Sequence, residues 1–333
     1  MDYRPARWLK GPNAMTVFGA VLRPWPRPRL DRERWELPDG DFLDVDRLAG
    51  PSPRAPLLLV CHGLEGSSRA AYVRGLVARA RARGMGVLAL NFRGCSGSQN
   101  RLPRLYHSGE TGDLALVVDR VAAERPGRPL LLCGFSLGGN VVVKYLGERK
   151  DRLPGEVAGA AVISVPFDLA RCAAALDGPG FWNRVYRERF LRGLRRKALL
   201  LLRRFPGLLD EGAVRGSGTF RAFDGTVTAP LHGFGSAEDY YARSSSRGFV
   251  AGVRRPLLAI SALDDPLVPS DSLPFEEAGA NPFVTLLATP AGGHVGFVSG
   301  GPLRPFYWAE ARAIEFLASV ADRAADALLA SGS

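Results

Sequence analysis

The chain alternates short aliphatic runs with amphipathic stretches. The runs that have the length of a buried strand lie at residues 57–61, 86–90, 130–134, 157–164, 256–261 and 283–288. Helical patterns of apolar and polar positions lie between most of these runs. Strands that alternate with helices along a chain form a parallel sheet covered by helices on both faces. The pattern therefore predicts an α/β fold with a mostly parallel central sheet.

The pattern changes at both ends of the chain. Residues 16–22 and 34–45 predict an antiparallel lead-in to the sheet, and Pro38, Asp39, Gly40 and Asp41 give the signal of a turn within it. After the last aliphatic run, residues 305–329 predict one long amphipathic helix that docks on the sheet.

A long interval without a clear core strand interrupts the alternation at residues 166–255. It carries helical patterns and follows a central strand. An insertion at the carboxyl end of such a strand lies over the crevice where these sheets bind ligands. We therefore expect the first part of an α/β domain at 1–165, an inserted helical cap at 166–253, and the second part of the domain at 254–333.

One of the predicted strands runs directly into Gly134-Phe135-Ser136-Leu137-Gly138, and an apolar helical pattern follows as far as Gly147. Gly-x-Ser-x-Gly between a strand and a helix is typical of the nucleophile elbow of serine hydrolases. The two glycines leave the space that the tight turn needs. We predict that Ser136 is a nucleophile; the alternative is an ordinary turn between a strand and a helix.

A serine nucleophile needs a base and an acid, which follow it along the chain in this arrangement. Of the four histidines, His232 and His294 follow Ser136. His294 lies in a glycine-rich loop after the last predicted strand and is the predicted base, whereas His232 lies in the predicted cap. The acid is expected at Asp264 or Asp265, directly after the strand at 256–261, because a carboxylate there can accept the Nδ1–H of the histidine. We favour Asp265 and expect Asp264 to cap the turn.

An oxyanion also needs backbone donors. We expect one from Leu137, the residue after the predicted nucleophile, and the other from Leu64, in the loop His62-Gly63-Leu64-Glu65-Gly66-Ser67 after an early strand. His62 precedes the serine, so we interpret it as a structural loop residue.

Composition narrows the classes of partner. Much of the formal net charge of +11 lies in residues 181–204. This segment has nine Arg and Lys residues and one acidic residue, Glu188, so its local net charge is +8. We expect either a solvated helix surface or a patch that contacts an anionic membrane, and no nucleic acid.

No apolar run approaches the roughly 20 residues of a membrane span, and the apolar stretch 14–22 lacks the cleavage site of a signal peptide. A cytoplasmic location is predicted, with the scattered cysteines reduced.

Several stretches together resemble the YheT-like, ABHD-type branch of the α/β-hydrolase fold superfamily. They are HGLEGS from His62, NFRGCSGSQNRLPRLYHSGETGDL from Asn91, GFSLGGN from Gly134, SVPFDL from Ser164, APLHGF from Ala229, ALDDPLVP from Ala262 and GGHVGF from Gly292. The resemblance implies an α/β-hydrolase fold with Ser136 as nucleophile, His294 as base and an aspartate of the 264/265 pair as acid. The branch that the chain resembles includes lipid esterases and acyltransferases.

The function expected from these observations is a serine carboxylic ester hydrolase for short- to medium-chain acyl or small lipid esters, with no cofactor and no metal. One alternative is an alcohol O-acyltransferase that uses the same acyl-serine intermediate. Its H-x-x-x-x-D motif is absent, since Gly112 stands where an aspartate would follow His107. Another alternative is a module without catalytic activity that binds lipid or nucleic acid through the basic cap.

Overall fold

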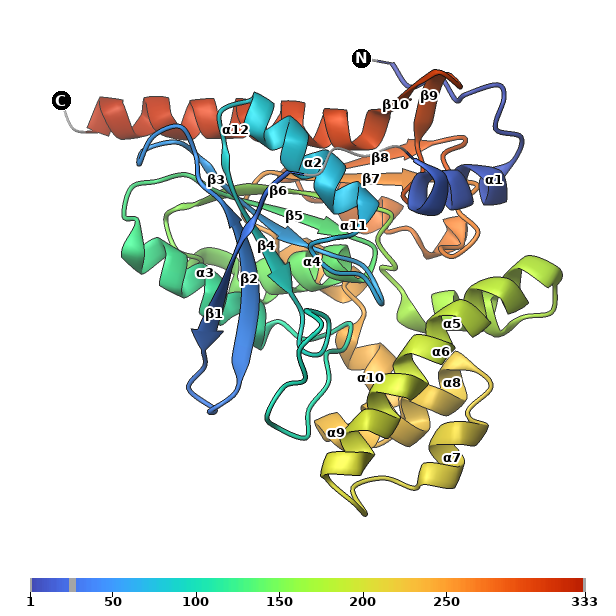
Figure 1. The fold of residues 1–333 in the computed structure, drawn as a ribbon. Coiled ribbons are helices and arrows are strands. Elements are labelled where there is room, and N and C mark those ends of the chain that lie inside the picture. The colour runs from blue at the N-terminus through green and yellow to red at the C-terminus, as the bar shows by residue number, and fades with distance from the viewer. Residues whose placement is uncertain (1, 24–27, 332–333) are drawn as a thin grey trace.

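The central feature of the computed structural model, which describes residues 2–23 and 28–331, is one large sheet (Figure 1). Within these residues the sheet has eight strands in the order β1-β2-β4-β3-β5-β6-β7-β8. Their bounds are β1 Asp31–Glu36, β2 Phe42–Leu48, β3 Leu57–Cys61, β4 Gly86–Asn91, β5 Leu130–Phe135, β6 Val157–Ile163, β7 Leu257–Ala262 and β8 Val284–Thr289. Strand β2 pairs antiparallel with β1 and with β4, and the other pairs are parallel. The predicted fold class is confirmed.

Helices cover both faces of the sheet because side chains alternate between the faces along each strand. Leu58 and Val60 of β3 pack toward α2 (Ala71–Ala82) and α12 (Trp308–Ser331). Their neighbours Leu57 and Leu59 belong to the core on the other face, which α3 (Gly112–Glu124) and α4 (Leu137–Arg149) cover. Figure 1 shows α2 and α12 on one side of the sheet and α3 and α4 on the opposite side.

The chain between β6 and β7 is helical and lies beside one end of the sheet (Figure 1). Its elements are α5 Leu169–Asp177, α6 Phe181–Arg204, α7 Glu211–Gly216, α8 Phe220–Phe223, η3 Asp224–Thr228, α9 Ala229–His232, α10 Ala237–Ser244 and η4 Arg247–Gly252. The long helix α6 buries Leu191, Leu194, Ala198 and Leu202. These positions recur every three or four residues, which is the spacing of one helix face. We call this segment the cap helices.

The N-terminal prediction is wrong at residues 16–22. This stretch forms the end of α1 (Pro12–Val17) and a π-helical turn, η1 (Phe18–Leu22). Pro12 stands in the first turn of α1, where its missing N–H costs no hydrogen bond, and Gly11 precedes it with φ +83°. The second part of the lead-in is confirmed as the β1–β2 hairpin, with its turn at Leu37–Asp41.

The C-terminal helix begins later than predicted. Residues Arg304–Tyr307 form β10, which pairs with β9 (Val298–Gly301), and α12 begins at Trp308. Both strands are short and contain glycine or proline, so they lack the aliphatic run by which the other strands were recognised. Shorter elements complete the description: η2 Lys150–Arg152, η5 Ser270–Ser272 and α11 Phe275–Gly279. No helix among the described residues is long and apolar enough to cross a membrane.

Candidate active site

Ser136 stands at a sharp turn between β5 and α4. Its backbone has φ +50° and ψ −121°, a conformation that residues with a Cβ rarely adopt. The turn is crowded: a Cβ on Gly134 would lie 2.5 Å from the Gly138 carbonyl oxygen, and a Cβ on Gly138 would lie 2.5 Å from the Cys61 carbonyl oxygen. The Gly-x-Ser-x-Gly pattern therefore follows from close backbone approach on both sides of the serine.

Three side chains from separate loops form a continuous hydrogen-bonded chain. His294 Nε2 lies 2.9 Å from Ser136 Oγ, and His294 Nδ1 lies 2.9 Å and 3.1 Å from the two carboxylate oxygens of Asp265. The Asp265 carboxylate is itself fixed, because its Oδ1 accepts the backbone N–H groups of Leu267 and Val268 at 2.9 Å and 3.2 Å. The structure thus brings together the three predicted residues in the order that triad chemistry requires.

Asp264 contacts the loop that carries the histidine. Its carboxylate accepts the backbone N–H of Gly293 at 2.9 Å, beside His294, and its expected role as a cap of its own turn stays a prediction. Burial raises the pKa of this carboxyl. Asp264 lies in the turn that follows β7 and holds the loop that carries His294, whereas Asp265, the next residue, reaches the ring.

Two further residues hold the histidine loop, and sequence reasoning missed both. The backbone N–H of His294 donates to Thr16 Oγ1 at 2.8 Å, and that of Val295 donates to Ser164 Oγ at 2.9 Å. Val295 has φ +59°, so the loop is held in a strained conformation. Thr16 was missed because its segment was interpreted as a strand. For Ser164 the one signal in the sequence was its place in SVPFDL, a stretch that carries the family resemblance.

The loop after β3 is anchored on either side of Leu64. The N–H of Gly63 donates to the Tyr72 hydroxyl at 3.0 Å, and the N–H of Glu65 donates to the Tyr106 hydroxyl at 2.8 Å. Glu65 has φ +54°, which turns the chain sharply after Leu64. Leu64 and Leu137 both line the cavity that contains Ser136 and His294. Both residues that are predicted to supply the backbone donors therefore line the same cavity as the serine.

The other histidines have structural surroundings. His62 Nδ1 donates to the Gly63 carbonyl at 2.8 Å and its Nε2 accepts the Phe92 N–H at 3.2 Å, so both ring nitrogens are occupied. Burial lowers the pKa of His62 to about 4, which keeps it neutral. His232 packs against His107 with ring centroids 4.4 Å apart, and neither is among the described residues that line the Ser136 cavity. Burial lowers the pKa of His232 to about 3.

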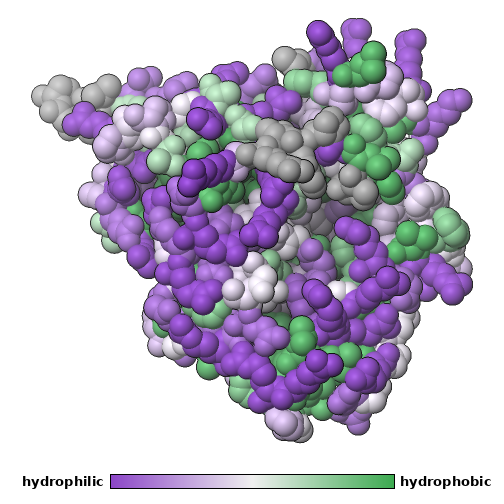
Figure 2. Space-filling view, in the orientation of Figure 1, coloured by the Kyte–Doolittle hydropathy of each residue, from purple (hydrophilic) through white to green (hydrophobic). Residues whose placement is uncertain are grey.

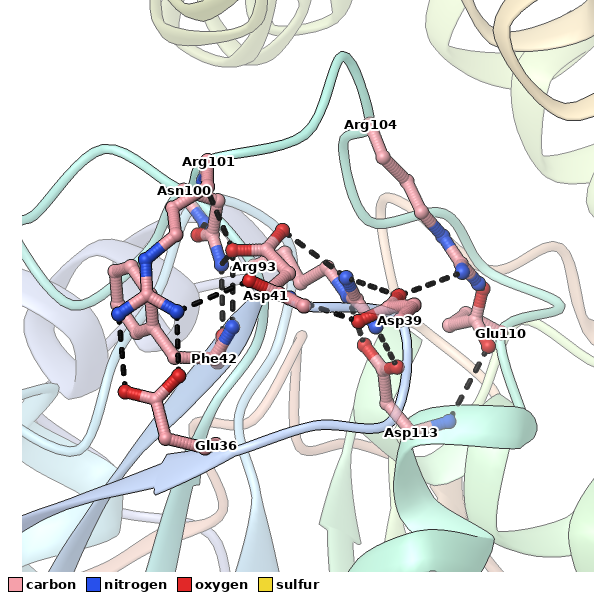
Figure 3. Close-up of polar contacts among 12 residues, drawn as sticks. Glu36, Asp39, Asp41, Phe42, Arg93, Asn100, Arg101, Arg104, Glu110 and Asp113 are labelled. Atoms are coloured by element: carbon pink, nitrogen blue, oxygen red, sulfur yellow. Dashed lines mark hydrogen bonds and ion pairs between the residues drawn. The ribbon is translucent and has the colours of Figure 1, made fainter.

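A buried polar network holds the stretch that begins at Asn91, one of those that carry the family resemblance (Figure 3). Sequence reasoning did not find this network. Arg93 forms a double hydrogen bond to Asp113 at 2.7 Å and 2.8 Å, and it also pairs with Asp41 at 3.0 Å. Asp41 in turn accepts from Asn100 Nδ2 at 3.0 Å. A buried arginine needs such partners because an uncompensated charge is costly in the interior. The network joins the β1–β2 turn to the loop that carries Tyr106.

The cavity at Ser136 is small and mostly apolar. Its volume is about 90 Å³. The cap helices supply a large share of its wall, including leucines and aromatic rings, and the described residues that line it are Leu64, Ser108, Ser136, Leu137, Pro166, Leu169, Cys172, Ala173, Leu176, Phe190, Phe220, Asp224, Tyr240, Tyr241, Leu267, Val268 and His294. An apolar lining with a few convergent polar groups is typical of a site for a small organic substrate.

Comparison with known proteins agrees with this architecture. The family model of the alpha/beta hydrolase fold matches residues 56–301. The YheT protein of Escherichia coli is 38% identical over 320 residues, which are 95% of this chain and 93% of that protein. A monoacylglycerol lipase of Saccharomyces cerevisiae is 35% identical over 89% of this chain and 64% of its own length. A phospholipase, ABHD3, of Mus musculus is 28% identical over 90% of this chain and 74% of its own length.

Among solved structures, an esterase from Pyrococcus furiosus matches with a TM-score of 0.54 and 19% identity, over 83% of this chain and 88% of its own. At that identity the likeness shows the fold. The family match shows that the chain belongs to the alpha/beta hydrolase fold family. Its identity with YheT over most of both chains places it in the YheT-like branch, and it is a hydrolase of the esterase and lipase type.

Proposed function

We propose that the protein is a serine carboxylic ester hydrolase in which Ser136 is the nucleophile, His294 the general base and Asp265 the acid. The observation that carries this proposal is the unbroken hydrogen-bonded chain from Ser136 Oγ through the His294 ring to the Asp265 carboxylate. Ser136 Oγ attacks the carbonyl carbon of the ester while His294 Nε2 takes its proton, and Asp265 stabilises the resulting imidazolium.

The tetrahedral intermediate carries a negative oxygen, which we assign to the backbone N–H groups of Leu64 and Leu137. Collapse of the intermediate expels the alcohol, which receives its proton from His294, and leaves the acyl group on Ser136. Water then attacks the acyl-enzyme with His294 again acting as base, and the carboxylic acid leaves. Each half-reaction returns His294 to its neutral form, and in the second the serine regains a proton that comes from water, so no cofactor is needed.

The substrate proposed is an ester with a short to medium acyl chain or a small lipid ester. The apolar wall and the small volume of the cavity favour a short apolar group beside Ser136. Relatives named as a monoacylglycerol lipase and a phospholipase support a lipid ester. We propose residues 166–253 as the cap, because its helices supply much of the cavity wall.

Hydrolysis of p-nitrophenyl esters of increasing acyl length tests the reaction and the cavity together. We expect the rate to be highest for short to medium chains and to fall as the acyl chain lengthens. Ser136→Ala should lower turnover by about 10⁴- to 10⁶-fold, the range found when a triad nucleophile is removed. Added alcohol should leave the free acid as the main product; a transesterified product in its place would identify an alcohol acyltransferase instead.

We also propose that α6 contacts anionic membranes. At its first turns Phe181 and Trp182 are 74% and 40% exposed. Figure 2 shows hydrophobic patches among the hydrophilic side chains over the cap helices. Among the basic residues of α6, Arg195 pairs with Glu188 and Lys197 with Glu65, whereas Arg184, Arg189 and Arg192 form no ion pair with the residues that the structure describes. All three are exposed on this helix.

Each arginine near an anionic bilayer contributes about 1 kcal/mol, and the exposed rings add apolar contact. Co-sedimentation with anionic and neutral vesicles at low and high salt tests this. We expect binding to anionic vesicles that weakens at high salt. Equal binding to both kinds of vesicle, or binding that salt does not change, would leave the cap as a substrate lid only.

A further inference from the structure

Asp224 places a carboxylate on the wall of the Ser136 cavity. It begins η3, the π-helical turn that follows α8. It is the only acidic side chain among the described residues that line the cavity, and most of its neighbours there are aliphatic or aromatic. The mechanism proposed above makes no use of it. A carboxylate in such surroundings is costly unless it receives hydrogen bonds.

The side chain is held in one orientation by two hydroxyl groups. Its Oδ1 accepts from Thr228 Oγ1 at 2.6 Å, and its Oδ2 accepts from the Tyr241 hydroxyl at 2.8 Å. No cation among the described residues is a cause of its pKa shift, and burial, the largest cause, raises the pKa to about 6. Each carboxylate oxygen has two lone pairs, so each can accept one more donor.

We propose that Asp224 accepts a hydrogen bond from a free hydroxyl on the alcohol part of the substrate, so that the enzyme selects esters of polyols over esters of simple alkanols. This inference rests on the proposed ester hydrolysis. A hydrocarbon acyl chain has no donor to offer a carboxylate, whereas a partly esterified polyol retains one. The small volume of the cavity, about 90 Å³, suits a short hydroxylated group better than a bulky quaternary ammonium.

Two esters that differ in a single group test the assignment. 2-Hydroxyethyl butyrate and propyl butyrate have the same number of heavy atoms, and the first has a hydroxyl where the second has a methyl. Both give the same butyryl-enzyme at Ser136, so their ratio of kcat/KM reports only the steps through acylation, in which the alcohol part is bound and expelled. A hydrogen bond to a charged group is worth about 1.5–3 kcal/mol, so we expect the hydroxylated ester to be preferred by about 10- to 100-fold.

Asp224→Ala should abolish this preference, bringing the ratio close to one, and Asp224→Asn should retain part of it because the amide oxygen still accepts. The matched control is Glu238→Gln, an exposed carboxylate on α10 whose side chain is 57% accessible; it should leave the ratio unchanged. Thermal melting of each variant shows that it is folded.

Four results would overturn the assignment. Wild-type enzyme that hydrolyses both esters through Ser136 without preference would refute it while leaving the proposed function standing. Asp224→Ala that slows both esters equally would show that the carboxylate only supports Tyr241 and Thr228. A preference for butyrylcholine over 3,3-dimethylbutyl butyrate that depends on Asp224 would identify a cation site instead. Failure of the wild type to hydrolyse either ester would count against the proposed function, and the Asp224 assignment would fail with it.

Discussion

Lys197→Met should weaken the connection between α6 and the loop that carries Leu64. Lys197 Nζ lies 2.6 Å from Glu65 Oε1, and the Tyr106 hydroxyl donates to the same oxygen at 2.9 Å. The two charged side chains are only 13% and 16% exposed. Gly193, one turn earlier on α6, lies close to the same side chain, since a Cβ there would overlap the Glu65 carboxylate. The ion pair therefore joins the cap helices directly to the loop after β3.

The magnitude follows from the burial of the pair. Removing one partner of a fully buried ion pair costs about 3–5 kcal/mol, because the other charge is left uncompensated. Glu65 keeps its hydrogen bond from Tyr106 and some contact with water, so we expect a loss of about 2–3 kcal/mol in the free energy of unfolding. A chain of this length loses about 2 °C in Tm per kcal/mol, so the expected fall in Tm is about 4–6 °C.

Thermal and denaturant unfolding of the wild type, Lys197→Met, Glu65→Gln and the double variant would measure the coupling. The double variant should lose less stability than the sum of the single losses, by about 1–3 kcal/mol. Arg196→Met, the exposed neighbour on α6, is the control and should change stability by less than about 0.5 kcal/mol. Additive losses, or a Lys197→Met protein as stable as the control, would refute the reasoning.

Two other predictions concern aspartates. Asp265→Asn should lower kcat by about 10⁴-fold because the amide holds the wrong tautomer of His294, whereas Asp264→Asn should lower it far less; the opposite order in steady-state kinetics would move the acid to Asp264. The raised pKa of Asp224, about 6 against an ordinary 3.8, means that its carboxyl stabilises the fold below about pH 4 and loses that contribution as pH rises through 6. Asp224→Asn should therefore gain stability relative to the wild type between pH 4 and pH 8, by at most about 3 kcal/mol; a difference in Tm that does not change with pH would contradict this.

Local patterns predicted the parts of the fold whose side chains are buried on both faces. The strands at Leu57–Cys61 and Leu130–Phe135 lie in the centre of the sheet. Each is a nearly continuous apolar run of strand length, which is typical of a strand buried on both faces. The serine, the histidine and the aspartate pair were found because each follows a strand in the chain order of the fold. The N-terminal helix was missed because residues 16–22 have apolar side chains that suit a strand and a helix equally well.

The residues that support the site were beyond local patterns. Thr16 lies 278 positions from His294 in the sequence, and Arg93 is bound by carboxylates from the β1–β2 hairpin and from α3. Such partners meet only when the whole sheet has formed, so no spacing along the chain indicates them. Asp224 gave no signal in the sequence either, because a single acid in a helical stretch is normally a solvated side chain.

Covalent labelling of Ser136 tests the central claim most directly. The purified protein would be treated with a fluorophosphonate, digested and examined by mass spectrometry, with Ser136→Ala and His294→Ala treated in parallel. The account predicts one phosphonylated peptide containing Ser136, no labelling of Ser136→Ala, and strongly slowed labelling of His294→Ala because the serine then lacks its base. A label on another residue, or labelling that persists in Ser136→Ala, would contradict it.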